Sequence, residues 1–271
     1  MSRIAVAATA PFGADVLERL AERHDVAALL TRPDRPRGRG RRLAPPAAKV
    51  VAEQRGIPVL QPERLTGAGD VGVHLHQLDA IVVAAYGRLI PNELLEQALW
   101  VNVHPSLLPR WRGAAPVERA IMAGDTETGV TIHETVEALD AGPIAAQRAF
   151  PIRPDDDAGA VFARAAEVAA ELLDDVLSGE PKFEPQPEEG ATYAEKIGSA
   201  DRELDLTAPP QDVVNRVRAL SPHIGARTVV DGRPLLVWRA REKDGEVELL
   251  EVQPEGRRRM TYDEYLRGLR S

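Results

Sequence analysis

The chain has 271 residues, 44% of them apolar and 28% charged, which is enough for one substantial globular domain and one smaller one. No apolar run reaches the roughly 18 residues that cross a bilayer, and the first apolar stretch leads straight into a helical pattern, which favours a buried strand over a signal peptide. The absence of cysteine excludes disulfides and thiolate metal ligands, and the six histidines show no metal-ligand spacing. We therefore expect a cytoplasmic protein without a bound metal.

Strand and helix patterns alternate along the first hundred residues. Short apolar runs predict strands over residues 4–8, 26–30, 80–85 and 100–104. Amphipathic composition predicts helices over residues 14–23, 46–55 and 92–98. Such alternation favours a Rossmann-like α/β fold with a mainly parallel sheet, in which ligands bind beyond the carboxyl ends of the strands.

The pattern changes in the second half of the chain. Residues 157–177 are typical of a long amphipathic helix, and the stretch after it is rich in Pro and Glu, as linkers are. A short helix is predicted over residues 209–220, and short strands over residues 227–230, 234–240, 246–252 and 257–261. Strands at this spacing suit a small OB-like β-barrel. We therefore expect a first domain over residues 1–184, a linker over residues 185–202 and an OB-like domain over residues 203–271.

The turns after the predicted strands lack the usual nucleotide-binding motifs. The first strand leads into ATAPFG where a dinucleotide-binding protein has G-x-G-x-x-G, and G-x-x-x-x-G-K-[ST] does not occur. NAD, FAD, ATP and GTP are therefore not the expected ligands.

Polar side chains that could perform acyl transfer surround the strand at residues 100–104. Asn102 and His104 are two positions apart, so both project from the same face of an extended backbone. Asp140 follows later in the chain, directly before the small residues Ala141 and Gly142. A strand-end histidine taken alone is more often a structural residue, but an amide, a titratable ring and a carboxylate together indicate an acyl-transfer site.

The net charge of −8 argues against a nucleic-acid partner until its distribution is considered. Residues 155–189 hold eleven acids against two bases, so the remainder of the chain is close to neutral. Residues 32–42, the basic arm, carry a net charge of +5 and are broken by Pro and Gly, which predicts a loop. This loop is either solvated surface or an arm that grips phosphates.

The Asn-x-His pair runs into Ser-Leu-Leu-Pro at residues 106–109, and Leu-Asp-x-Gly follows at residues 139–142. This combination resembles the formyltransferases that use 10-formyltetrahydrofolate. Four further stretches are similar to the methionyl-tRNA formyltransferase family, at residues 31–65, 84–91, 110–132 and 191–197. Segments near the C-terminus are similar as well, so the resemblance spans nearly the whole chain.

The resemblance implies formyl transfer from 10-formyltetrahydrofolate to the amino group of initiator methionyl-tRNA, performed by a monomer that does not bind membranes. Asn102 and a protonated His104 are expected to donate to the developing oxyanion, while Asp140 keeps His104 charged and accepts the amine proton. The expected folate-binding residues are Ser106, Leu107, Leu108, Pro109, Leu89 and Ile90. The expected tRNA-binding residues are Arg35, Arg37, Arg39, Arg41 and Arg42.

Other functions stay open at this point. A formyltransferase for an amino sugar nucleotide or for glycinamide ribonucleotide would keep the three polar residues but would not need the basic arm. A non-catalytic RNA-binding protein would need the arm but not the three residues. The side to which His133 points depends on a strand register that the sequence does not fix. The sequence also does not reveal whether the short C-terminal domain binds RNA.

Overall fold

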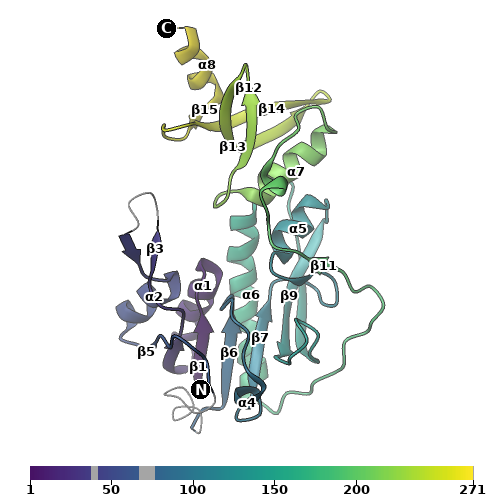
Figure 1. The fold of residues 1–271 in the computed structure, drawn as a ribbon. Coiled ribbons are helices and arrows are strands. Elements are labelled where there is room, and N and C mark those ends of the chain that lie inside the picture. Colours follow the sequence, from purple (N-terminus) through teal and green to yellow (C-terminus); the bar gives the residue numbers. More distant parts are fainter. Residues whose placement is uncertain (38–41, 67–76, 271) are drawn as a thin grey trace. The chain divides into compact units, whose positions relative to one another are not determined.

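The computed structural model describes residues 1–37, 42–66 and 77–270 (Figure 1). They form two compact units that share the chain in alternating segments. The first unit comprises residues 1–112, 129–149 and 163–191, and the second comprises residues 113–128, 150–162 and 192–271. No helix within the described ranges is long and apolar enough to span a membrane.

The first unit is built on a seven-stranded sheet in the order β10-β9-β7-β6-β1-β2-β5. Its strands are β1 (Arg3–Ala8), β2 (Asp25–Leu30), β5 (Val59–Leu60), β6 (Ala80–Ala84), β7 (Trp100–His104), β9 (Glu127–Glu134) and β10 (Ile144–Pro151). The pairs β1–β2, β1–β6, β2–β5 and β6–β7 are parallel, and β7–β9 is antiparallel. The expected mainly parallel sheet is therefore confirmed, and Figure 1 shows β1, β6, β7 and β9 side by side.

Burial explains why these segments are strands. All five residues of β6 are buried, as are all but the first residue of β1, so both strands read as continuous apolar runs. The helices α1 (Pro11–Leu20), α2 (Ala47–Arg55), α4 (Asn92–Leu95) and α6 (Ala158–Ser178) follow the predicted order. Gly13 lets α1 pass close to β6, because a Cβ there would lie 2.2 Å from the carbonyl oxygen of Ala84.

The basic arm departs from the predicted loop. Strands β3 (Arg35–Arg37) and β4 (Arg42–Ala44) pair antiparallel on either side of residues that lie outside the described part. Asp34 anchors the base of this hairpin by accepting from Lys49 Nζ at 2.9 Å and from Gln61 Nε2 at 2.8 Å. The prediction of a loop was wrong for residues 35–37 and 42, since both strands are edges, where a proline needs no partner for the N–H that it lacks, while residues 38–41 lie outside the described part.

The second unit contains a four-stranded antiparallel sheet with the strand order β12-β13-β14-β15. Its elements are α5 (Pro116–Met122), the 3-10 helix η1 (Ala200–Arg202), α7 (Pro210–Leu220), β12 (Ala226–Val230), β13 (Arg233–Lys243), β14 (Glu246–Pro254), β15 (Met260–Thr261) and α8 (Tyr262–Arg270). A further two-stranded sheet joins β8 (Arg112–Gly113) and β11 (Tyr193–Ala194). The antiparallel C-terminal domain is confirmed, while its order is that of an open sheet, with no β12–β15 pairing among the described residues.

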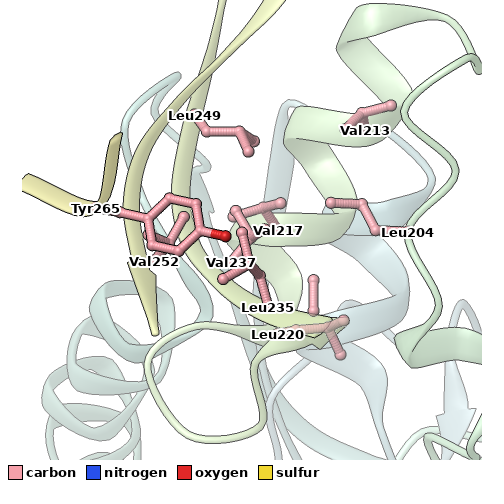
Figure 2. Close-up of a cluster of buried hydrophobic side chains, with 10 residues drawn as sticks. Leu204, Val213, Val217, Leu220, Leu235, Val237, Leu249, Val252 and Tyr265 are labelled. Carbon is pink, nitrogen blue, oxygen red and sulfur yellow. The ribbon is translucent and has the colours of Figure 1, made fainter. Parts of the chain in front are cut away.

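The core of this second unit lies between the sheet, α7 and α8 (Figure 2). Its buried members are Leu204, Val213, Val217, Leu220, Ala226, Leu235, Val237, Leu249, Val252 and Tyr265. Helix α8, which the sequence patterns did not predict, contributes Tyr265 and packs against β14 and β15. A short C-terminal helix thereby covers apolar surface that a four-stranded sheet leaves exposed.

Candidate active site

The site lies at the carboxyl end of β7. Val101 and Val103 are buried on one face of this strand, and Asn102 and His104 project from the other. Strand β9 runs antiparallel beside it, in a register that places His133 directly opposite Asn102. This register settles the orientation that the sequence left open, since His133 lies on the same face as the two polar residues of β7.

Asp140 lies beside both strands and brings the three predicted residues together. Its Oδ1 is 3.2 Å from Asn102 Nδ2, and its Oδ2 is 3.7 Å from His104 Nδ1. The aspartate is buried and adopts a left-handed backbone with φ of 50°, which Asp tolerates better than most residues. Residues 36 positions apart in the chain therefore form one polar cluster.

His133 completes this cluster and fixes the amide of Asn102. Its Nδ1 lies 2.8 Å from the carbonyl oxygen of Glu134, and its Nε2 lies 3.1 Å from Asn102 Nδ2. A carbonyl only accepts, so the proton is on Nδ1 and Nε2 accepts from the amide. The side chain of His133 is 2% exposed, which isolates this arrangement from water.

His104 is held by a backbone carbonyl on its far side. Its Nε2–H donates to the oxygen of Trp111 at 2.8 Å, so Nδ1 is the nitrogen that faces Asp140. Burial lowers the pKa of His104 below its ordinary value of 6.5, and this effect outweighs the opposing charge of Asp140. The expected charged ring is therefore corrected: near pH 7 His104 is neutral and carries a lone pair on Nδ1.

Asn102 also differs from the expected oxyanion donor. A side-chain amide has two N–H bonds, and those of Asn102 point to Asp140 and to His133. Its Oδ1 accepts no hydrogen bond from the described residues. The amide is therefore arranged to fix Asp140 and to accept a hydrogen bond, because no N–H remains free for a developing oxyanion.

The loop predicted to bind folate is tightly fixed. Ser106 is fully buried, and its hydroxyl donates to the carbonyl of Arg110 at 2.7 Å. Thr131 accepts from Leu108 N at 3.1 Å and donates to the carbonyl of Ser106, while Gln147 donates to the carbonyl of Leu108 at 3.0 Å. Of the predicted folate-binding residues, Leu107 and Pro109 are partly exposed, and Ser106 and Leu108 serve the interior of the loop.

The second predicted folate-binding segment follows β6. Leu89 is 82% exposed and Ile90 packs at the edge of the core cluster under α4. Leu139, which precedes Asp140, is 61% exposed. Two large apolar side chains of the first unit therefore remain uncovered in segments that adjoin predicted site residues.

The structure describes only part of the predicted tRNA-binding set. Arg35 is exposed on β3. Arg37 and Arg42 lie on β3 and β4, and Arg39 and Arg41 lie outside the described residues.

Sequence reasoning left one residue that contacts the cluster open and missed another. His133 was named from the sequence, but its orientation needed the register of two neighbouring strands. Gln186 hydrogen-bonds the backbone of Asp140 from within the predicted linker, where the Pro- and Glu-rich composition carries no signal of a packed side chain. No cluster of three or more His, Asp or Glu in the described ranges could hold a metal ion.

Comparison with known proteins finds two family models that match the chain. Residues 2–177 match the formyl transferase family, and residues 196–248 match its C-terminal domain. Methionyl-tRNA formyltransferase from Halorhodospira halophila is 39% identical, over 99% of this chain and 97% of that protein. The chain belongs to the methionyl-tRNA formyltransferase family. The resemblance drawn from the sequence motifs is thus confirmed.

Solved structures show the same fold. Methionyl-tRNA formyltransferase from Clostridium thermocellum superimposes with a TM-score of 0.70 at 18% identity, over 94% of this chain and 99% of that one. HypX from Aquifex aeolicus in complex with tetrahydrofolic acid gives a TM-score of 0.64 at 20% identity, over 98% of this chain. The chain spans about half of HypX, at 47% of its length.

Proposed function

We propose that this chain transfers the formyl group of 10-formyltetrahydrofolate to the amino group of methionyl-tRNA. The observation that supports the chemistry is the convergence of Asn102, His104 and Asp140 in one buried cluster at the end of β7. Relatives that are about two-fifths identical over nearly the whole chain are named for this reaction. That the acceptor is initiator tRNA, and that the protein acts as a cytoplasmic monomer, stay predictions.

The reaction begins with attack of the neutral amine of methionine on the formyl carbon. A bond forms between that nitrogen and the formyl carbon, and the bond from the carbon to N10 of the folate breaks. The amine loses a proton and N10 gains one. A base beside the formyl carbon therefore has to accept the proton from the amine, and an acid at the same place has to donate a proton to N10.

His104 suits the role of that base. It is neutral near pH 7 and its Nε2 is occupied by the carbonyl of Trp111, so the proton goes to Nδ1. The resulting imidazolium then faces Asp140, whose negative charge stabilises it. In this structure Asp140 Oδ2 lies 3.7 Å from His104 Nδ1. The proton can pass from Nδ1 to N10 as the folate leaves.

Asn102 and Asp140 orient the reacting groups. The amide of Asn102 donates a hydrogen bond to Oδ1 of Asp140, which leaves Oδ2 to face His104. Its Oδ1 is the acceptor that fits an N–H of the attacking amine. This division of roles replaces the oxyanion role first expected for Asn102, because the hydrogen bonds of the amide point elsewhere.

The loop at residues 106–109 and the exposed Leu89 suit a folate. A pterin needs an apolar slot with backbone hydrogen bonds at its edge, and the partly exposed Leu107 and Pro109 of this fixed loop contribute apolar surface to such a slot. The hydrogen bonds of Thr131 and Gln147 hold this loop before any ligand arrives. Preorganisation of this kind reduces the entropy lost on binding.

The acceptor decides between this function and its alternatives. Purified protein is mixed with 10-formyltetrahydrofolate and, in separate reactions, methionyl initiator tRNA, an amino sugar nucleotide or glycinamide ribonucleotide. We expect a formylated product with the tRNA alone, detected as formylmethionine after deacylation. Product with either small acceptor alone would assign a sister activity, and tRNA binding without any product would indicate a non-catalytic RNA-binding protein.

A further inference from the structure

Gln186 connects the predicted linker to the backbone that carries Asp140. Its Nε2 lies 2.9 Å from the carbonyl oxygen of Asp140 and 2.7 Å from that of Gly142. Its Oε1 accepts from Arg112, at 3.1 Å from Nε and 2.8 Å from a terminal nitrogen. Both ends of the amide are thus fully used, so its orientation is fixed.

Arg112 is an unusual anchor because its side chain is only 5% exposed. Its planar guanidinium presents two parallel N–H bonds to one oxygen, a geometry that Lys cannot reproduce. The residue directly follows Trp111, whose carbonyl accepts the Nε2–H of His104. One short stretch of chain therefore holds both partners of the His104–Asp140 pair, His104 directly and Asp140 through Gln186.

The segment that carries Asp140 requires such support. The left-handed backbone of Asp140 is a conformation that L-residues adopt at a cost, and it persists only where surrounding contacts hold it. On one side, Gly142 packs so closely that a Cβ would lie 1.9 Å from the carbonyl oxygen of Glu134. On the other side, Gln186 holds the carbonyls of Asp140 and Gly142.

We propose that Arg112 and Gln186 are positioning residues that keep the carboxylate of Asp140 facing His104 during formyl transfer. The inference rests on the proposed function and extends it to a segment whose composition is that of a linker. Neither residue touches the reacting atoms. Both act through the backbone of Asp140, and loss of either one lets the carboxylate move away from His104.

Two substitutions of Gln186 test this role. Gln186→Ala removes all four hydrogen bonds, whereas Gln186→Glu keeps the acceptors for Arg112 and loses the donors to the two carbonyls. Since the donors hold Asp140, we expect both variants to lower kcat by about 30-fold, the effect of losing two hydrogen bonds to backbone carbonyls, with little change in the KM for folate. Glu189→Ala, an exposed position of the same segment, is the matched control and keeps wild-type rates.

Arg112→Lys tests the anchor. If Arg112 acts only through Gln186, the double variant that combines Arg112→Lys and Gln186→Ala has a kcat no lower than that of Gln186→Ala alone. Rates that fall further in the double variant would contradict the proposed chain of contacts.

The titration of His104, followed by NMR of labelled imidazole, separates positioning from general loss of structure. Burial has the largest effect on the pKa of His104 and lowers it, Asp140 and the hydrogen bond to the carbonyl of Trp111 raise it, and His133 lowers it. Withdrawal of Asp140 in Gln186→Ala should therefore lower the pKa of His104 further. A protein that is only less well folded would show a pKa closer to 6.5 or unchanged.

These outcomes also distinguish this inference from the proposed function. If wild type forms no formylated product, the proposed function fails, and the NMR titration still decides whether Gln186 positions Asp140 because it needs no substrate. If wild type is active while Gln186→Ala keeps both its kcat and the pKa of His104, the positioning role is wrong.

Discussion

His104 is the residue whose protonation differs most from what the sequence led us to expect. Its charged form is disfavoured by burial, which lowers its pKa below 6.5 although Asp140 raises it. A base must be unprotonated, so the rate per neutral methionine amine should persist as pH falls below 6.5 and decline only as pH passes through the lowered pKa of His104. The amine itself titrates at about 7.7 to 8.0, so the pH profile of kcat/KM is divided by the fraction of amine that is neutral, and an acid limb above 6.5 in the divided profile would contradict the neutral, buried base.

Asp140→Asn sharpens this prediction. The variant keeps the shape of the side chain but removes the charge that raises the pKa of His104. We expect the acid limb to move to lower pH and kcat to fall, because the imidazolium formed during transfer loses its counter-charge. An unchanged acid limb would show that Asp140 does not act on His104 electrostatically.

His133 is expected to act through Asn102. Gln at this position can still present an acceptor to the Asn102 amide, whereas Leu cannot. We therefore expect His133→Leu to lower kcat about fivefold to tenfold, in line with the loss of one hydrogen bond, and His133→Gln to stay close to wild type. Steady-state kinetics with both variants measures this, and equal rates in the two would remove His133 from the site.

At the scale of elements, the sequence predicted those helices and strands that have a local pattern. It missed those that are stabilised by contacts with distant residues. The predicted strands over residues 227–230, 234–240 and 246–252 are separated by Asp-Gly pairs at residues 231–232 and 244–245, and all four residues adopt the positive φ that these types favour in tight turns. Strand β7 was predicted from its apolar alternation. The arm hairpin and α8 were missed, since their stability comes from anchoring contacts such as Asp34 with Lys49 and from packing of Tyr265, which no local pattern reports.

Helix α8 carries a stability prediction. The hydroxyl of Tyr265 is buried without a hydrogen-bond partner among the described residues, and Figure 2 shows it directed toward the apolar side chains of the cluster. An unsatisfied buried hydroxyl costs about 1 to 3 kcal/mol. Tyr265→Phe should therefore stabilise the protein by about 1 kcal/mol and raise Tm, whereas Tyr193→Phe at an exposed position should not. A lower Tm for Tyr265→Phe would mean that the hydroxyl has a partner.

At the scale of the whole molecule, charge is divided between regions. The chain is net acidic, yet residues 32–42 form a basic arm that the resemblance to methionyl-tRNA formyltransferases predicts to bind tRNA. If Arg35 and Arg37 each neutralise one phosphate, replacing both by Ala should weaken tRNA binding and reduce the slope of log affinity against log salt by roughly 2. Binding titrations at several salt concentrations measure this. An unchanged slope, with the KM for folate also unchanged, would show that the arm is only solvated surface.

The sequence predicted which residues belong together but not how they are arranged. Asn102, His104 and Asp140 were identified by type and motif. Their protonation and donor directions follow from partners that lie elsewhere in the chain, namely Trp111 and His133. Burial and strand register set these features, and neither is encoded within a few residues of the site.

Single-turnover formyl transfer tests most directly whether the three side chains act on one formyl carbon. Enzyme saturated with 10-formyltetrahydrofolate is mixed with methionyl-tRNA, and formylmethionine is followed over time for wild type, Asn102→Ala, His104→Ala, Asp140→Ala and the triple variant. We expect each single variant to lose orders of magnitude in rate with its fold intact by circular dichroism, and the triple variant to be only slightly slower than the worst single one, because the residues act as a unit. A near-normal rate in any single variant, or losses that multiply in the triple variant, would contradict a shared site.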